Sequence, residues 1–161
     1  MEFDARAHNA LAWIPASPTL PKNMSDTPVR PDLNVLGTPL ESCCTNPMTG
    51  FFRDGSCRTH AQDLGLHTVC ILVTADFLVF SKDRGNDLTT PNLAYEFPGL
   101  VPGDKWCLCA ERWAEAAAAN MAPPVVLEST HARSLEVIDL DVLKAHALDP
   151  QQEGALRGNR S

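Results

Sequence analysis

Two cysteines separated by a single residue are the feature of this sequence with the clearest chemical potential. Cys107 and Cys109 lie in the run Trp106-Cys107-Leu108-Cys109-Ala110, directly before an alanine-rich segment. On a β-strand, residues i and i+2 face the same side, so both thiols would emerge close to the start of the next helix. A helix N-terminus carries partial positive charge and lowers the pKa of a neighbouring thiol. The spacing therefore favours a thiolate that acts as a nucleophile or as a metal ligand.

Histidine and arginine side chains could complete a thiol-dependent active site. His67 begins an apolar run and could act as a base, although a histidine at a strand edge often only forms local hydrogen bonds. Arg53 and Arg84 each stand near a glycine turn, where a guanidinium could hold an anionic group; a turn or a helix end explains them equally well. The candidate catalytic residues are Cys109, Cys107 and His67, and the candidate substrate-binding residues are Arg53 and Arg84.

The other cysteines permit a metal centre as an alternative. Cys43 and Cys57 flank a long loop, which a metal ion, a disulfide or a packed thiol pair could each hold in place. Thiolate and imidazole ligands favour zinc, which is therefore the candidate cofactor. Packing alone would also explain cysteines, because the free thiol is among the most buried side chains; we expect it for Cys70, and we regard Cys44 as incidental. The candidate metal ligands are Cys43, Cys57, Cys107, Cys109 and His131.

Hydrophobic patterns predict the elements that must position these residues. A short strand is expected at residues 34–37, and buried or partly buried strands at 67–73, 105–109, 125–128 and 135–138. Helices are expected from Thr74 to Arg84, from Ala110 to Met121, and from Asp139 to about Ala147. The stretch from 39 to 65 is a long cysteine-containing loop, since its turn signals are too dense for regular structure. The predicted fold is α+β, with a small mixed sheet of about four strands and two or three helices.

Composition divides the chain into one domain and two tails. Residues 15–31 contain five prolines and few large apolar side chains, so residues 1–31 are expected to form a disordered proline-rich arm. Residues 149–161 are polar, lack periodicity and are expected to form a disordered tail. Residues 32–148 remain as a single α+β domain of ordinary size.

Charge and hydropathy exclude several classes of partner. The whole net charge of −7 falls within residues 32–148, which carry 15 acidic and 8 basic side chains, so we expect no nucleic-acid partner. The longest apolar stretch, in 69–80, is far shorter than the roughly 20 residues of a membrane span, so we expect no membrane partner. The N-terminus lacks a basic start followed by an apolar core, which favours a cytoplasmic location and cysteines that are reduced, ligated or redox-active. A small anionic molecule or a protein could be the partner, and the oligomeric state is open.

Several segments, which together cover nearly all of residues 34–147 and leave both tails outside, form a recognisable pattern. They are Asn34-Val35-Leu36-Gly37 with Pro39-Leu40, Thr49-Gly50-Phe51-Phe52-Arg53-Asp54-Gly55, His67-Thr68-Val69-Cys70, Phe80-Ser81-Lys82 with Arg84-Gly85-Asn86-Asp87-Leu88, Phe97-Pro98-Gly99-Leu100, Pro102-Gly103-Asp104-Lys105-Trp106-Cys107-Leu108-Cys109-Ala110 and Ala122-Pro123-Pro124-Val125-Val126-Leu127. Taken together, these segments resemble a known bacterial family, the domain of unknown function 2237.

The resemblance separates the cysteines and histidines without implying a reaction. It places Cys44 where the family pattern commonly has serine, and Ser56 where it commonly has cysteine, whereas His60 does not match. The positions that agree with the family pattern are Cys43, Cys57, Cys70, Cys107, Cys109, His67 and His131.

Three hypotheses for the function follow from these observations. The chain could be a binding or accessory module whose cysteines only pack, and this hypothesis is slightly favoured because packing explains much of the thiol pattern. It could instead bind zinc, or be a thiol-dependent enzyme that uses Cys107 or Cys109 with His67 or His131.

Overall fold

The structure is a computed structural model that describes residues 31–151. The predicted proline-rich arm, apart from Pro31, and most of the predicted C-terminal tail lie outside the described residues. The elements in chain order are β1 (His67–Leu72), α2 (Ala75–Asp83), the 3-10 helix η3 (Leu93–Tyr95), β2 (Lys105–Cys109), α3 (Ala110–Ala118), the 3-10 helices η4 (Leu127–Ser129) and η5 (Ala132–Glu136), and α4 (Leu140–Ala145). The prediction of a mixed α and β fold is confirmed.

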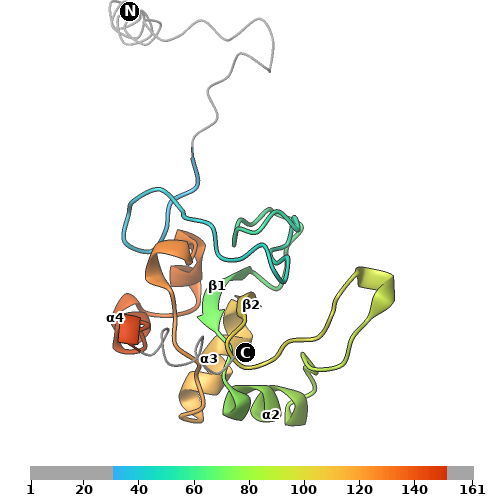
Figure 1. Cartoon of the computed structure of the whole chain (residues 1–161). Helices are drawn as coiled ribbons and strands as arrows, with labels where there is room; N and C mark the ends of the chain where they lie inside the picture. The colour runs from blue at the N-terminus through green and yellow to red at the C-terminus, as the bar shows by residue number, and fades with distance from the viewer. Residues whose placement is uncertain (1–30, 152–161) are drawn as a thin grey trace, which may run out of the picture. The chain divides into compact units, whose positions relative to one another are not determined.

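The sheet consists of β1 and β2, which pair in antiparallel register with Cys70 opposite Cys107. Figure 1 places this pair at the centre of the fold, with α3 following directly from β2. The register shifts between His67 and Val69, so that the extra residue Thr68 brings His67 opposite Cys109. Such a β-bulge redirects the side chains beside it, and bulges are common next to functional sites.

Helix α2 begins and ends as its sequence predicts. The Thr74 hydroxyl accepts a hydrogen bond from the backbone N–H of Phe77 at 3.2 Å and so caps the first turn. Gly85, with φ of 91°, follows the C-terminal cap residue Arg84 in the left-handed conformation that glycine adopts without steric cost. The buried face of the helix, which includes Phe77 and Leu78, joins the apolar core.

Helix α3 starts immediately after β2, with Cys109 as its N-terminal cap residue. It ends at Ala118, three residues earlier than predicted, because Asn120 adopts a left-handed φ of 58° and the N–H of Met121 donates to the carbonyl of Ala116. Trp113 anchors the helix in the core: its ring is fully buried and its indole N–H donates to the carbonyl of Pro123 at 3.1 Å. The start of α3 is therefore fixed rigidly beside the strand pair.

The prediction of about four strands is wrong for the described part of the chain, where the sheet has two. At 34–37, the Asn34 side chain accepts hydrogen bonds from the N–H groups of Leu36 and Thr38 and folds the chain into a turn. At 125–128, Val125 forms a single bridge to Ile71, because Pro123 and Pro124 have no N–H to extend the ladder.

The remaining predicted strand, at 135–138, is also absent. Its first half belongs to the 3-10 helix η5, which His131 caps by accepting a hydrogen bond from the N–H of Arg133. The N–H of Ile138 then donates back to the carbonyl of Ser134, which keeps the backbone coiled. Of the three apolar residues in this segment, Leu135 and Val137 are exposed and only Ile138 enters the core.

Two clusters of buried side chains hold the fold together. The larger one is apolar and packs α2, α3 and the segment around Val125 against the strand pair. The smaller one consists of the buried cysteines 43, 57, 70 and 107 and connects the loop of residues 39–66 to both strands. Among residues 31–151, no helix has the length and apolar character required to cross a bilayer.

Candidate functional site

A cavity of about 670 Å³ lies beside the end of β2 and the start of α3. Its lining combines groups that could react with groups that could bind, contributed by segments far apart in the sequence. The hairpin that carries η3 reaches this cavity with Tyr95, and Figure 1 shows this yellow-green segment standing away from the helices. The lining includes Cys109, His67, Arg53, Arg112, Asp87, Trp106 and Tyr95.

Cys109 is a free, partly exposed thiol at the junction of strand and helix. Its side chain makes no capping hydrogen bond to α3, so it is not committed to holding the helix end. Gly65 approaches it closely: a Cβ on Gly65 would stand 3.6 Å from Cys109 Sγ and 2.9 Å from His67 Cε1. The absence of a side chain at position 65 therefore leaves room for the thiol and the imidazole to lie together.

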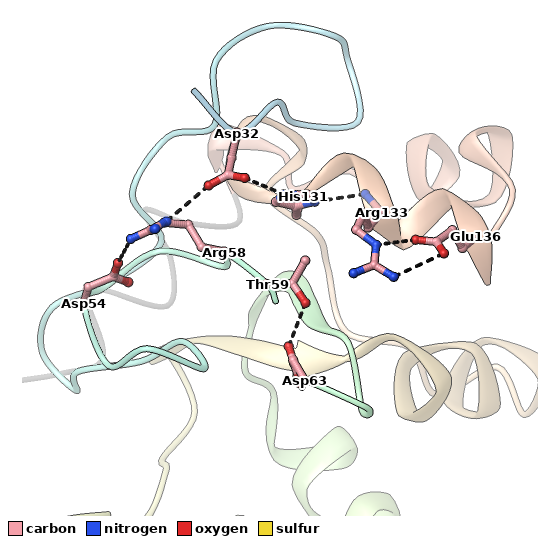
Figure 2. A network of polar contacts seen from close by, with 8 residues as sticks. All are labelled: Asp32, Asp54, Arg58, Thr59, Asp63, His131, Arg133 and Glu136. Carbon is pink, nitrogen blue, oxygen red and sulfur yellow. Dashed lines mark hydrogen bonds and ion pairs between the residues drawn. The ribbon is translucent and has the colours of Figure 1, made fainter. Parts of the chain in front are cut away.

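His67 stands opposite Cys109 in the sheet and is oriented by Asp63. Its Nδ1 lies 2.6 Å from Asp63 Oδ1, and its backbone N–H donates to Asp63 Oδ2 at 2.9 Å. The Asp63 side chain is fully buried, whereas that of His67 is 45% exposed. Thr59 donates its hydroxyl hydrogen to Asp63 Oδ2 at 3.0 Å, as Figure 2 shows. A carboxylate bound to Nδ1 places the imidazole proton on that nitrogen and leaves Nε2 able to accept another.

The arginines around the cavity differ from those that the sequence suggested. Arg53 borders it, with its guanidinium 5.3 Å from the ring centroid of Trp106. Arg84 is not among the lining residues; it lies over the Phe80 ring and 3.7 Å from a carboxylate oxygen of Glu115. Arg112, on the first turn of α3, is the second lining arginine, and it donates a hydrogen bond to the Arg84 carbonyl at 3.0 Å.

One acidic side chain also borders the cavity. Hydrogen bonds from the hydroxyls of Thr90 and Thr89, at 2.6 and 2.7 Å, hold the pKa of Asp87 well below its ordinary value. Asp87 is therefore ionised at neutral pH, and the lining carries charges of both signs.

Four cysteines are joined in two disulfides: Cys43 with Cys70, and Cys57 with Cys107. The Cα atoms are 5.9 and 5.2 Å apart, within the usual range for a disulfide. For Cys43 and Cys57 a disulfide was one of the open alternatives and is the one found, with strand cysteines as the partners, whereas the expectation of reduced thiols is wrong for Cys70 and Cys107. Cys70, which was expected only to pack, is a full member of the group, because β1 places it directly opposite Cys107. The two free cysteines of the described chain are Cys44 and Cys109.

The predicted metal ligands fall in three places. Cys43, Cys57 and Cys107 lie in the buried sulfur cluster, of which Cys107 also borders the cavity, whereas Cys109 borders the cavity from outside the cluster. His131 belongs to a polar network (Figure 2), where its Nε2 lies 3.2 Å from Asp32 Oδ1 and its Nδ1 accepts from the N–H of Arg133 at 3.0 Å. Both ring nitrogens of His131 are thus engaged, one with Asp32 and the other with the first turn of η5.

Arg58 extends this network to the cysteine-containing loop. Its guanidinium contacts Asp54 at 2.7 Å and Asp32 at 3.1 Å (Figure 2). The hydrogen bonds to Asp54 and Asp32 raise the pKa of Arg58 above its ordinary value. Since these groups are largely exposed, we assign the network an orienting role and little stability.

Besides the cavity residues Trp106, Tyr95 and Asp87, sequence reasoning missed two residues of the site, Asp63 and Arg112. Asp63 lies four residues before His67, and the intervening Gly65 was the available signal that the chain turns back there. Arg112 is the third residue after Cys109, so any helix starting at 110 puts it in the same first turn. Both could have been found by asking which side chains a strand-to-helix junction brings beside Cys109.

Comparison with protein families agrees with the resemblance seen in the sequence. The family described as uncharacterized protein conserved in bacteria (DUF2237) matches residues 33–147. The chain belongs to this family. The DUF2237 region contains the whole cavity lining and the whole sulfur cluster. A comparison with curated proteins finds no match for the chain.

Proposed function

We propose that this DUF2237 protein is a thiol-dependent enzyme in which Cys109 is the nucleophile. The observation that carries the proposal is that His67, oriented by the buried Asp63, stands opposite Cys109 in the sheet while both border one cavity. Directly opposed residues of an antiparallel pair have Cβ atoms about 5 Å apart, which brings an imidazole within reach of a thiol. A nucleophile, a base and a third group that orients the base form the recurring arrangement of covalent catalysis.

Each group has a defined task in this mechanism. His67 Nε2 accepts the proton of the Cys109 thiol, and Asp63 keeps the ring in the tautomer that can do so. The Cys109 sulfur then adds to a carbonyl carbon of the substrate, the π electron pair of the C=O bond moves onto the oxygen, and the protonated His67 returns its proton to that oxygen. The N-terminus of α3 stabilises the thiolate, and it also stabilises negative charge that develops on the substrate beside it.

The cavity lining favours a small substrate that carries both an anionic and an apolar part. Arg53 and Arg112 supply the positive charges, and Trp106 and Tyr95 supply aromatic surface. Asp87 adds a negative charge, which would orient an anionic substrate by repelling its acidic end. We therefore propose an anionic carbonyl compound as the substrate class.

Selective alkylation tests the nucleophile. We expect Cys109 to react with iodoacetamide well below pH 8, at a rate that falls about tenfold or more in His67→Asn, because the thiol loses its base. Cys44, the other free cysteine, serves as the internal reference, and Cys44→Ser should leave the fast reaction unchanged. Equal rates at Cys44 and Cys109, with no effect of His67→Asn, would refute the mechanism.

A charged probe tests the substrate class separately. Iodoacetate and iodoacetamide differ in charge, so the ratio of their rates reports the electrostatic environment of each thiol. We expect the iodoacetate rate divided by the iodoacetamide rate to be higher at Cys109 than at Cys44. Replacing Arg112 by alanine should lower this ratio at Cys109. An unchanged ratio in Arg112→Ala would reject the anionic substrate while leaving the nucleophile untouched.

A binding module is the second candidate, favoured by the aromatic part of the cavity lining. A pocket with a few convergent polar groups is typical of binding sites as well as of active sites. The two candidates differ in the role of sulfur. A module that only binds would retain its ligands in Cys109→Ser and would show no turnover in the native protein.

A further inference from the structure

The four cysteines of the sulfur cluster form a compact group that resembles a metal site in its ligands and dimensions. The Sγ atoms of Cys43, Cys57 and Cys70 all lie within 4.8 Å of one another, and Cys107 is bonded to Cys57. All four residues are buried, with exposed fractions between 0 and 7%. Sulfurs from two separate disulfides are therefore packed against each other instead of lying at separate points of the fold.

We propose that this cluster, once reduced, binds one Zn²⁺ through Cys43, Cys57, Cys70 and Cys107. Zinc bound by four thiolates has Zn–S distances of about 2.3 Å, which places the sulfurs of a tetrahedron about 3.8 Å apart. The Cys57 sulfur lies within 4.8 Å of the Cys43 and Cys70 sulfurs, and the Cys107 sulfur is bonded to it, so the four sulfurs must spread by side-chain rotations to reach a tetrahedron. The ligand set differs from the one predicted from sequence by replacing Cys109 and His131 with Cys70.

The loop explains why a metal would matter when the disulfides are absent. Residues 39–66 contain no helix or strand, and they are joined to the strand pair through Cys43 and Cys57. Reduction removes both links and leaves a long segment with little regular structure to hold it. A single ion bound to two loop thiols and two strand thiols would restore both attachments, because binding energy of the metal becomes folding energy.

The conversion between the two forms balances with a dithiol as reductant. Two dithiol molecules donate four electrons and four protons to the two disulfides, giving four cysteine thiols and two oxidised dithiols. Zn²⁺ then displaces four protons as it binds the four thiolates. All four ligands come from the protein and are buried, so the site is closed and its role is structural.

Metal binding to the reduced chain tests the proposal. The protein is reduced with a phosphine without oxygen, freed of reductant and titrated with Co²⁺, whose absorption reports tetrahedral thiolate coordination. We expect one Co²⁺ per chain, displaced by Zn²⁺, and none bound by the oxidised protein. Absence of the tetrahedral cobalt spectrum in the reduced protein would overturn the proposal.

A protection map identifies the ligands without any substitution. In the zinc-loaded wild type, alkylation followed by mass spectrometry should modify Cys44 and Cys109 and spare the four cluster thiols. Cys57→Ser should weaken Co²⁺ binding about 100-fold or more, while the matched control Cys44→Ser should not change it. Should Cys57→Ser fail to fold, the wild-type map still decides, since protection of Cys109 or alkylation of Cys57 contradicts the assigned ligands.

Discussion

The two cysteines of β2 differ in bonding and exposure, although only Leu108 separates them. Both border the cavity, but Cys107 is buried, joined to Cys57 and packed in the sulfur cluster, whereas Cys109 is free and partly exposed. The difference comes from their neighbours: Cys107 is bonded to Cys57 of the loop and lies opposite Cys70 of β1, whereas Cys109, beyond the bulge, lies opposite His67. Residue type alone therefore does not assign a cysteine its role. One position stabilises the fold, and the other is available for chemistry.

Removing the disulfide of Cys107 should produce the largest contrast between the two positions. Replacing both Cys57 and Cys107 by alanine should lower the free energy of unfolding by about 2–5 kcal/mol, because the denatured chain is no longer cross-linked. Cys109→Ala should cost about 0.5 kcal/mol or less, since the side chain is partly exposed and unbonded. Urea denaturation under non-oxidising, non-reducing conditions measures the free energy of unfolding of both variants. Equal decreases would contradict a structural role for Cys107 and a non-structural one for Cys109.

The reactivity of Cys109 should depend on Asp63 almost as strongly as on His67. In Asp63→Asn, the amide N–H₂ can face His67 Nδ1 and hold the imidazole in the tautomer whose Nε2 already carries a proton. We expect alkylation of Cys109 to slow about tenfold, and Cys44 to be unaffected. Stopped alkylation followed by mass spectrometry gives both rates from one sample. A uniform change at the two cysteines would indicate general unfolding instead.

A methyl group at Gly65 should disturb the pocket thiol and spare the sulfur cluster. The added Cβ would lie 2.9 Å from His67 Cε1, closer than carbon atoms approach, so the imidazole must shift away from its contact with Asp63. We expect Gly65→Ala to lower the alkylation rate of Cys109 about threefold while both disulfides still form. Non-reducing peptide mapping checks the disulfides, and an unaltered rate would show that His67 acts on Cys109 from another position.

The smallest expected effect concerns the acidic residue of the cavity. Hydrogen bonds from Thr90 and Thr89 lower the pKa of Asp87 from its ordinary value of 3.8, so the folded state favours the ionised form. The resulting stabilisation is present above pH 3.8 and is lost as the pH falls through the lower pKa of the folded state. An NMR titration should find Asp87 still ionised at pH 3.8, and Thr90→Val should move its pKa upward. A titration centred on 3.8 in the wild type would contradict this.

Local sequence signals predicted the helices correctly. The predicted sheet was too large, in part because prolines lack the backbone N–H groups that strand pairing requires. Thr74 and Gly85 mark the ends of α2 through interactions within a few residues, so sequence alone located them. Val125 lies in an apolar run that reads as a strand, yet it follows Pro123 and Pro124, which cannot extend a ladder. The same property of proline that ends a helix thus also shortened the sheet.

For the site, sequence identified the residue types but not which of them meet. Cys109 and His67 were both candidates, but the bulge at Thr68 that opposes them depends on pairing between residues about 40 positions apart. The pairing of the cysteines depends on how the loop folds back over the strands, which its turn signals do not specify. Arg84 was a candidate because it lies near a glycine, and Arg112 was not considered, whereas the helix start decides which arginine borders the cavity.

The two disulfides interleave along the chain, with Cys57 lying between Cys43 and Cys70, and Cys70 lying between Cys57 and Cys107. A single cleavage of the backbone anywhere from 43 to 107 therefore leaves at least one disulfide joining the two fragments. Cleavage beside Leu64, which is 92% exposed, would leave both disulfides joining the two fragments. In the oxidised form, a protease that nicks this surface loop would not release a fragment, and the nicked molecule would gain only the mass of one water until a reductant separated the pieces.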